Sequence, residues 1–200
     1  TGQIQGLGSN LLFVIPGRIG GPRSPGGVQA NRLVYTDATN LRAKLAEEAD
    51  VSAAIQRNAT LKFGNKLDKG AAVFGVEANY PSIISLKVTA GRFFRQSEQQ
   101  SARKVAVLGQ TAKVNLFGEG QALGKIIDVA GLKYSVIGIL APRGAIFGID
   151  LDNSIYVPFA SAERQFGIDR LNTIYISAKI ASEVKNVQNK ATAILSKRLS

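Results

Sequence analysis

The sequence predicts an α+β fold, in which both chain ends form a mixed α/β subdomain and the middle forms an inserted, mainly β subdomain. The order strand, helix, strand occurs on both sides of the central segment. Short runs rich in β-branched residues, separated by glycine, fill that central segment. The last predicted helix carries a stripe of apolar residues at Val184, Val187, Ala191, Ile194 and Leu195. These patterns favour two subdomains, of which the second interrupts the first.

The N-terminal part begins with an apolar run over Leu11–Ile15, which predicts a buried strand that ends at a Pro-Gly pair. Residues 17–27 are so rich in Gly and Pro that they predict a loop without regular structure. A helix follows, and Thr36 or Asp37 can cap it. Its buried face is predicted to carry Ala38, Leu41 and Leu45, and its end the acidic Glu47, Glu48 and Asp50, which oppose the helix dipole.

The next segment predicts three strands and a short helix. The strands are residues 51–56, 60–63 and 71–77. Turn signals between them are Gly64-Asn65 and Lys69-Gly70. Residues 79–85 then predict the helix, with Pro81 in its first turn, where the missing N–H of proline does no harm.

The central segment combines a strand, a helix and a hairpin. Residues 104–108 are an apolar run that stops at Gly109, and residues 110–117 predict a two-turn helix. Gly118 can end this helix because glycine adopts a left-handed cap without a Cβ penalty. The hairpin strands are residues 125–129 and 133–139, joined by Ala130-Gly131-Leu132.

The C-terminal part is predicted to contain both strands and helices. Ile155–Pro158 predicts a strand, and Phe159–Phe166 predicts a helix that ends at Gly167. Residues 171–177 alternate well enough to predict another strand, and Ser182 can cap the last helix.

Composition excludes several classes of activity. The 200 residues contain no cysteine and no histidine, so thiolates, disulfides, the usual serine-triad base and the commonest transition-metal ligand are missing. We therefore expect a non-catalytic domain without a cofactor or metal of its own. No run approaches the roughly 20 apolar residues that a membrane-spanning helix needs. The net charge of +11 would suit nucleic acid, anionic lipid or an acidic partner, but the cations are scattered along the chain.

Two segments have some features of ligand sites. The glycines of residues 17–27 lack the spacing of a phosphate-binding loop, so an ordinary loop is the favoured interpretation. Asp150 and Asp152 would offer oxygen ligands to a hard cation, or an acid and base pair, if they shared a cleft. Two carboxylates are few for a metal site, so a polar turn before the next strand is favoured.

Cationic and aromatic residues occur together in one segment. Arg92, Arg95 and Arg103 lie near Phe93 and Phe94, and cations beside aromatic rings are the ingredients of a nucleic-acid surface.

An apolar group near residue 147 is a candidate partner contact. Ile146, Phe147 and Ile149 are flanked by Arg143 and Asp150, as an exposed contact loop would be. The same residues would also fit a local core, and the sequence leaves both interpretations open.

The central motifs carry a family resemblance. They occur in the order GRFF (91–94), VAVLG (105–109), LFG (116–118), ALGK (122–125) and YSVIGIL (134–140). This series resembles the extracytoplasmic core domain of MacB-type ABC transporter permeases. The resemblance extends to QGLGSNLLFVIPG at residues 5–17 and to the strand before Pro158, and so covers nearly the whole chain. One departure is the mixed charge after GRFF, where the family usually has an acidic run.

The resemblance implies a division and a set of structural residues. Residues 1–88 and 154–200 would form a porter-like subdomain, and residues 89–153 a sabre-like insert. The motif residues are expected to be structural: Gly91, Arg92, Phe93, Gly109, Gly118 and Gly124. The resemblance also implies that the GRFF aromatic rings pack in the core or at the subdomain junction and that the arginine pairs locally, which is favoured over a nucleic-acid surface.

The resemblance also implies a function. The domain would lie on the periplasmic or extracellular face of the cytoplasmic membrane and couple ATP hydrolysis inside the cell to movement outside it. Drugs, peptides or other amphiphiles would be exported. ATP and Mg would bind an associated ATPase domain or subunit, and the partners would include a second permease copy and a periplasmic adaptor, but no nucleic acid. The alternatives are a lipoprotein-extracting permease of the same superfamily and a basic nucleic-acid-binding module.

Overall fold

The computed structural model describes residues 10–16, 18–19 and 32–199. The contacts divide the chain into two compact units. The chain-end unit comprises Thr1–Ile55 and Ile168–Ser200, and the central unit comprises Gln56–Gly167. These boundaries differ from the predicted subdomain boundaries, which group residues 56–88 and 154–167 with the chain ends. The division into porter-like and sabre-like subdomains stays a prediction.

The chain-end unit contains an antiparallel sheet in the order β2-β1-β12-β3. Its strands are β1 (Leu11–Ile15), β2 (Arg18–Ile19), β12 (Thr173–Ala178) and the first part of β3 (Ala49–Phe63). The predicted strand over Leu11–Ile15 is therefore confirmed. The prediction that residues 17–27 lack regular structure is wrong at Arg18–Ile19, because this pair forms a ladder with β1. The rest of that loop lies outside the described residues.

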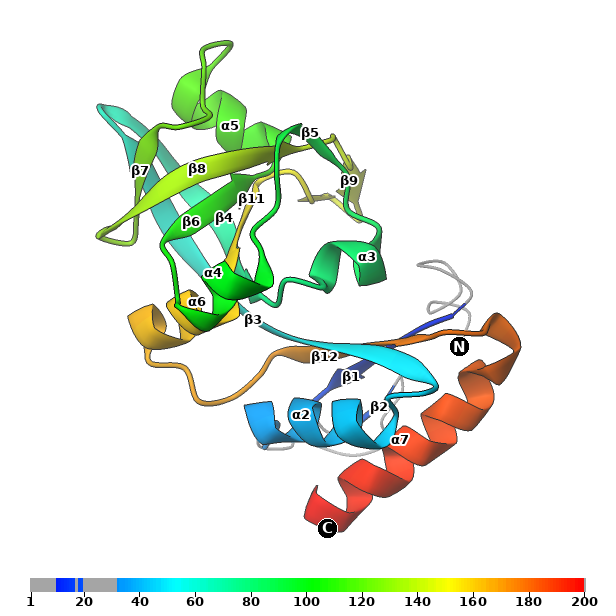
Figure 1. Cartoon of the computed structure of the whole chain (residues 1–200). Coiled ribbons are helices and arrows are strands. Elements are labelled where there is room, and N and C mark those ends of the chain that lie inside the picture. The colour runs from blue at the N-terminus through cyan, green and yellow to red at the C-terminus, as the bar shows by residue number, and fades with distance from the viewer. Residues whose placement is uncertain (1–9, 17, 20–31, 200) are drawn as a thin grey trace. The chain divides into compact units, whose positions relative to one another are not determined.

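Two helices cover one face of this sheet (Figure 1). They are α2 (Tyr35–Lys44) and α7 (Val184–Leu199), and a 3₁₀ turn over Ala181–Glu183 precedes α7. Together with the C-cap residue Leu45, their buried apolar residues are Ala38, Leu41, Val187, Ala191 and Leu195, the last three lying at the predicted helical spacing. Burial of these stripes holds both helices on the sheet.

The ends of α2 differ from the prediction. The helix begins at Tyr35, so Asp37 lies in its first turn, where its carboxylate accepts the Val34 N–H at 3.0 Å. The guanidinium of Arg198 from α7 donates to the same carboxylate, with Nη2 2.7 Å from Oδ2. The helix stops at Lys44, before the acidic residues that were expected to oppose its dipole. The acidic residues therefore lie beyond the helix, whose last turn carries the basic Arg42 and Lys44, as its dipole favours.

The strands of the central unit close into a ring. They are the second part of β3, β4 (Lys66–Val76), β5 (Val88–Gly91), β6 (Val105–Leu108), β7 (Ile126–Val129), β8 (Leu132–Leu140) and β11 (Ser154–Pro158). The order runs from β3 through β4, β11, β6 and β8 to β7, which pairs with β3 again, while β5 pairs with β8. The pairs β4–β11 and β6–β8 are parallel, and β7–β8 is antiparallel. The sheet is thus mixed and barrel-like.

Several strand predictions need correction. Residues 51–56 and 60–63 belong to one continuous strand, β3, because neither glycine nor proline interrupts the chain between them. Lys69-Gly70 lies inside β4 and is not a turn. The turn at Gly64 is confirmed, with φ at 59°. The strand β5 was not predicted.

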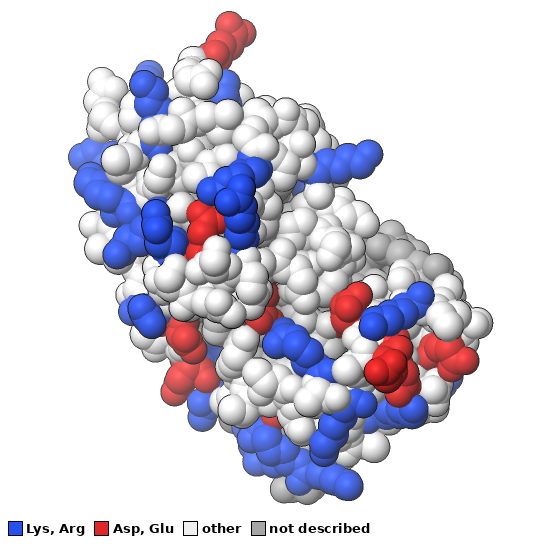
Figure 2. Space-filling view, viewed as in Figure 1, with Lys and Arg blue, Asp and Glu red and all other residues white. Residues whose placement is uncertain are grey.

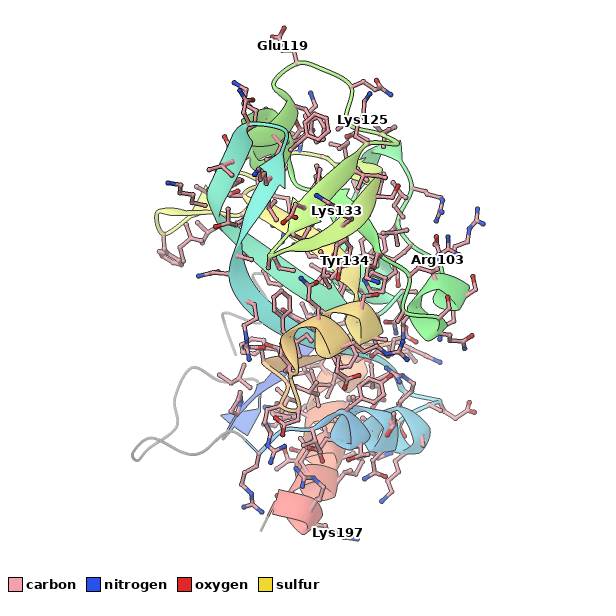
Figure 3. The ribbon with its side chains drawn as sticks, turned by 90° about the vertical axis from the view of Figure 1, so that its left-hand side faces the viewer. Arg103, Glu119, Lys125, Lys133, Tyr134 and Lys197 are labelled. Atoms are coloured by element: carbon pink, nitrogen blue, oxygen red, sulfur yellow. The ribbon has the colours of Figure 1, made fainter. Side chains whose placement is uncertain are left out.

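The helices of the central unit pack around this ring (Figure 1). They are α3 (Tyr80–Ile84), α4 (Gln96–Gln100), α5 (Gln110–Phe117) and α6 (Phe159–Phe166). The structure confirms the predicted bounds of α5 and α6 and places Pro81 in the first turn of α3. Tyr134 of β8 points toward α6, where its hydroxyl donates to Gln165 Oε1 at 2.6 Å (Figure 3). Burial raises the pKa of Tyr134 to about 12.

The charged side chains do not form a single continuous surface in the view of Figure 2. Lys and Arg are scattered there among uncharged residues and a smaller number of Asp and Glu. This distribution agrees with the scatter of cations along the sequence. In the part of the chain that the structure describes, no helix is long and apolar enough to cross a bilayer.

Candidate interaction site

The apolar group around residue 147 forms an exposed hairpin in the central unit. Its strands are β9 (Ala145–Ile146) and β10 (Ile149–Asp150), joined by a two-residue turn at Phe147 and Gly148. The exposed fractions are 48% for Ile146, 97% for Phe147 and 66% for Ile149. The sequence left open whether this group is exposed or buried in a local core, and the structure places it in solvent.

The turn of this hairpin holds a bulky residue in a strained conformation. Phe147 has a φ of 52° and Gly148 a φ of 77°. Two-residue hairpin turns with positive φ at both positions prefer Asn or Asp followed by Gly. A left-handed backbone costs most non-glycine residues about 1 to 2 kcal/mol. The chain therefore keeps an aromatic ring at the tip despite a local cost, as is often found at functional sites.

A buried carboxylate holds the base of the hairpin. Asp152 is only 8% exposed, and its Oδ1 accepts the Arg143 N–H at 2.7 Å while its Oδ2 accepts the Gly144 N–H at 3.0 Å. Across the base, the Leu151 N–H donates to the Gly144 carbonyl at 3.0 Å. Asp150 accepts the Asp152 N–H at 2.8 Å. Both carboxylates are thus engaged in a polar turn, and among the described residues no cluster of three or more potential metal ligands occurs.

The GRFF segment pairs its arginine locally. Arg92 donates from Nη1 and Nη2 to the two carboxylate oxygens of Glu98, at 2.8 and 3.0 Å. This hydrogen-bonded guanidinium lowers the pKa of Glu98 to about 2, and the carboxylate raises the pKa of Arg92. The Arg95 N–H also donates to Glu98, at 2.8 Å. The local pairing implied by the family resemblance is therefore present.

The aromatic residues of GRFF pack inside the central unit. Phe94 is buried, and its ring centroid lies 4.2 Å from that of Phe93. Phe93 in turn lies 6.5 Å from Tyr156, which stacks on Phe74 at 5.0 Å. This arrangement favours internal packing over the stacking surface that a nucleic-acid site would need.

The predicted structural glycines fall into two groups. A Cβ on Gly91 would collide with the Ile137 carbonyl, and a Cβ on Gly109 would collide with the Asp152 carbonyl. Gly118 and Gly124 have open space but positive φ angles of 57° and 82°. The predicted left-handed cap at Gly118 is wrong, because its ψ of −127° lies outside the left-handed helical region, although the residue does end α5. The first two are positions of close backbone approach, and the other two are turns.

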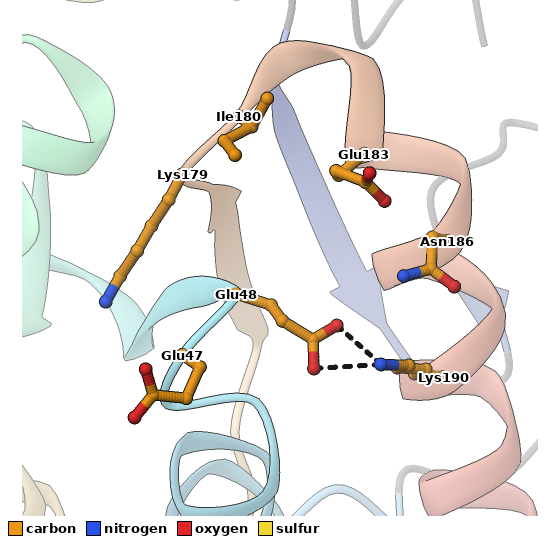
Figure 4. Close-up of a pocket in the computed structure, with 7 residues that line it drawn as sticks. All are labelled: Glu47, Glu48, Lys179, Ile180, Glu183, Asn186 and Lys190. Carbon is orange, nitrogen blue, oxygen red and sulfur yellow. Dashed lines mark hydrogen bonds and ion pairs between the residues drawn. The ribbon is translucent and has the colours of Figure 1, made fainter.

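A recess in the chain-end unit is a weaker candidate site (Figure 4). It has a volume of about 300 Å³ and is lined by Glu47, Glu48, Lys179, Ile180, Glu183, Asn186 and Lys190. The Lys190 ammonium lies 2.8 Å from Glu48 Oε2, and the Lys179 ammonium donates to the Ala46 carbonyl at 2.9 Å. Three carboxylates and two ammoniums line the recess, so its walls carry a formal charge of −1 and offer little attraction to an anionic ligand.

Comparisons with known proteins give a consistent result. Residues 1–194 match the family described as the MacB-like periplasmic core domain. The chain is 31% identical, over 98% of its length, to the macrolide export ATP-binding/permease protein MacB of Bdellovibrio bacteriovorus, and covers 30% of that protein. It is 31% identical, over 96% of its length, to the pyoverdine export ATP-binding/permease protein PvdT of Pseudomonas syringae pv. syringae, and covers 29% of it.

Solved structures share the fold. The periplasmic region of MacB from Actinobacillus actinomycetemcomitans has a TM-score of 0.80 at 22% identity, covering 97% of this chain and 86% of that one. The extracellular domain of the noncanonic ABC-type transporter YknZ from Gram-positive bacteria has a TM-score of 0.75 at 22% identity, covering 94% and 93%.

The fold and the family match define a class of protein, the extracytoplasmic region of a membrane ABC permease. Within this class, the chain belongs to the family of MacB-like periplasmic core domains. The chain spans about 30% of the length of the curated relatives named above. The resemblance seen in the central motifs is therefore confirmed.

Proposed function

We propose that this chain is the moving extracytoplasmic part of a MacB-type exporter. ATP hydrolysis on an associated ATP-binding domain or subunit drives its motion, and the motion drives the export of amphiphilic drugs or peptides. The family match over residues 1–194 supports this proposal, as do relatives named as macrolide and pyoverdine export proteins. A second permease copy completes the transporter, because a dimer is the arrangement that the family resemblance implies.

The chemistry of energy conversion belongs to another part of the transporter. The sequence carries no phosphate-binding motif of the form GxxxxGK[ST], and it lacks histidine and cysteine. The domain would therefore act by moving and by binding, with ATP and Mg held on the ATP-binding part.

The exposed hairpin is the proposed contact with a periplasmic adaptor. The observation that carries this assignment is Phe147, which is 97% exposed at the tip of a turn held by Asp152. Exposed aromatic anchors on rigid supports are typical of binding hot spots. A stable interface buries about 800 Å² on each partner, which is more than three side chains provide. The adaptor would therefore take the hairpin as an anchor and contact further surface around it.

Replacing Ile146, Phe147 and Ile149 together with Ser in the intact transporter tests this proposal. We expect the affinity for the purified adaptor of the same export system to fall at least about 30-fold, since hot-spot anchors contribute about 2 kcal/mol or more. The melting temperature should hold, because the three side chains are exposed.

The matched control is a second triple variant of exposed apolar residues of the central unit. Leu67, Val114 and Ile126 are 46%, 55% and 59% exposed, and their replacement with Ser should leave adaptor affinity unchanged. Normal adaptor binding and full export by the hairpin variant would refute the assigned contact. A large loss of stability would show that the hairpin residues contribute to the core.

A further inference from the structure

The loop that carries the hairpin is attached at both ends to the first turn of one helix, α5. At the loop entry, Gln110 Nε2 donates to the Leu140 carbonyl at 3.0 Å. At the loop exit, the Gly109 N–H donates to the Ser154 carbonyl at 2.8 Å. Four consecutive residues, 109–112, make these and the following contacts, so one short segment contacts the loop at both of its ends.

The first turn of α5 also forms hydrogen bonds with the base of the hairpin. The Thr111 and Ala112 N–H groups donate to the Asp152 carbonyl, at 3.1 and 3.3 Å. The Thr111 hydroxyl donates to Asp150 Oδ2 at 2.6 Å. Asp152 therefore accepts from α5 through its backbone and from Arg143 and Gly144 through its side chain. It links the helix to the base of the hairpin.

The helix is itself firmly placed in the central unit. Ala112 and Leu116 are buried on its inner face. Asn115 Nδ2 donates to Asp68 Oδ2 of β4 at 3.1 Å, and Asp68 is almost fully buried. At Gly109 the chain passes so close to Asp152 that a Cβ would not fit. A rigid support therefore carries an exposed, strained tip.

We propose that the first turn of α5 is a positioning element that fixes the orientation of the hairpin tip before a partner binds. Thr111 and Asp152 are its positioning residues, and neither needs to contact the partner. Pre-ordering of a binding loop raises affinity because the ordering entropy is lost on folding and not on binding. The effect on adaptor affinity rests on the proposed function, whereas the order of the hairpin does not.

The variant Asp152→Asn weakens the support at the base of the hairpin and leaves the residues of the tip unchanged. An amide side chain offers one acceptor oxygen, so its NH₂ group would face one of the two N–H donors of Arg143 and Gly144. Asp128→Asn is the matched control, because the Asp128 carboxylate accepts the Gly131 N–H at 2.8 Å in the β7–β8 hairpin. Both variants remove one negative charge and weaken a carboxylate contact at a hairpin.

Amide hydrogen exchange on the folded 200-residue chain gives the first readout. In Asp152→Asn the amide that then faces the NH₂ group, either Arg143 or Gly144, should exchange at least about tenfold faster, as expected when a protecting hydrogen bond is lost. In Asp128→Asn these two amides should keep their rates. Unchanged exchange of Arg143 and Gly144 in Asp152→Asn would overturn the inference, whatever the adaptor does.

Position 111 provides a second test that survives if Asp152→Asn fails to fold. Thr111→Val removes the hydroxyl that binds Asp150, and Thr111→Ser restores it. A ¹⁹F label on the ring at position 147 should show one narrow environment in the parent chain and in Thr111→Ser, and a broadened or second signal in Thr111→Val. Identical spectra in all three chains would overturn the inference.

Adaptor affinity in the intact transporter then separates this inference from the proposed contact. Thr111→Val should weaken adaptor binding about fivefold to tenfold, with recovery in Thr111→Ser. If Thr111→Val alters the ¹⁹F signal and leaves affinity unchanged, the positioning role in binding is refuted. If the triple Ser variant of the hairpin also binds normally, the proposed contact itself is wrong, while the ordering of the hairpin by α5 stands on the exchange and ¹⁹F results.

Discussion

Gly91 gives the most quantitative prediction about the fold. It opens the GRFF motif at the end of β5, where it pairs with Gly138 of β8. Its φ is 71°, and a Cβ would collide with the Ile137 carbonyl and approach Leu123 Cδ2 to 2.8 Å. The two strands therefore come together at a point where neither backbone leaves room for a side chain.

Two costs add up in the variant Gly91→Ala. The positive φ costs about 1 kcal/mol or more for alanine, and overpacking against a backbone atom costs about 1 to 3 kcal/mol. The sum is about 3 kcal/mol. Gly167→Ala is the matched control, because Gly167 adopts the left-handed conformation, with φ 62° and ψ 37°, and no atom lies within 4 Å of an added Cβ. That variant should lose only about 1 kcal/mol.

Calorimetry of thermal unfolding measures the difference in stability between the two variants. For a chain of 150 to 250 residues, 1 kcal/mol corresponds to roughly 2 to 4 °C. Gly91→Ala should therefore lower the melting temperature by roughly 6 to 12 °C, and Gly167→Ala by roughly 2 to 4 °C. Equal shifts in the two variants would refute the reasoning, because they would show that the close approach of β5 and β8 adds nothing to the backbone cost.

Two further predictions concern an ion pair and a turn. The pKa of Glu98 is lowered from 4.5 to about 2, chiefly by the hydrogen bond from Arg92, so the unfolded chain takes up the proton first as the pH falls. The free energy of unfolding should fall by about 1 to 2 kcal/mol between pH 4.5 and 2. This figure is discounted for solvent screening, because the Arg92 side chain is 41% exposed. In acid denaturation, Glu98→Gln should make stability depend less on pH over this range. Ala130 has a φ of 50° before Gly131 in the β7–β8 turn, so Ala130→Asn should raise stability by about 0.5 kcal/mol, and a lower melting temperature would contradict this assignment of the turn.

The sequence predicts helices and strands well where a run of apolar residues ends at a glycine or proline. The helices over Gln110–Phe117 and Phe159–Phe166 have the predicted bounds, and each is followed by glycine with a positive φ. The short helix α4 was not predicted, because QSEQQ contains no apolar residue to give periodicity. Lys69-Gly70 was misread as a turn because a strand glycine and a turn glycine look alike in one sequence.

The closure of the ring could not be predicted from local patterns. It depends on β7 pairing with both β3 and β8. Leu61 lies opposite Val129, and the hydrophobic periodicity of each strand does not show which distant strand it will pair with. The predicted subdomain boundary at residue 88 has a different origin. That boundary is implied by the family resemblance, whereas the compact units divide the chain after Ile55 and before Ile168.

The candidate site was predicted in part. The sequence indicates an apolar group among turn-forming residues, namely Ile146, Phe147 and Ile149. Whether these side chains are exposed depends on how segments distant in sequence pack around them. Asp152 was interpreted as part of a polar turn, and its hold on the amides of residues 143 and 144 was not foreseen. Thr111 gave no signal at all, because a threonine in the first turn of a helix is ordinary and its partner Asp150 lies 39 residues later.

The central claim is that the hairpin tip is kept for binding at the expense of local stability. Phe147→Asn tests it directly, because Asn before Gly148 is the pair that this turn prefers and the Phe147 ring is exposed. Titration of the purified adaptor against the intact transporter, with the melting temperature measured on the same samples, gives both quantities. The account predicts an affinity at least about tenfold weaker with an equal or higher melting temperature. Unchanged affinity in this variant would contradict it.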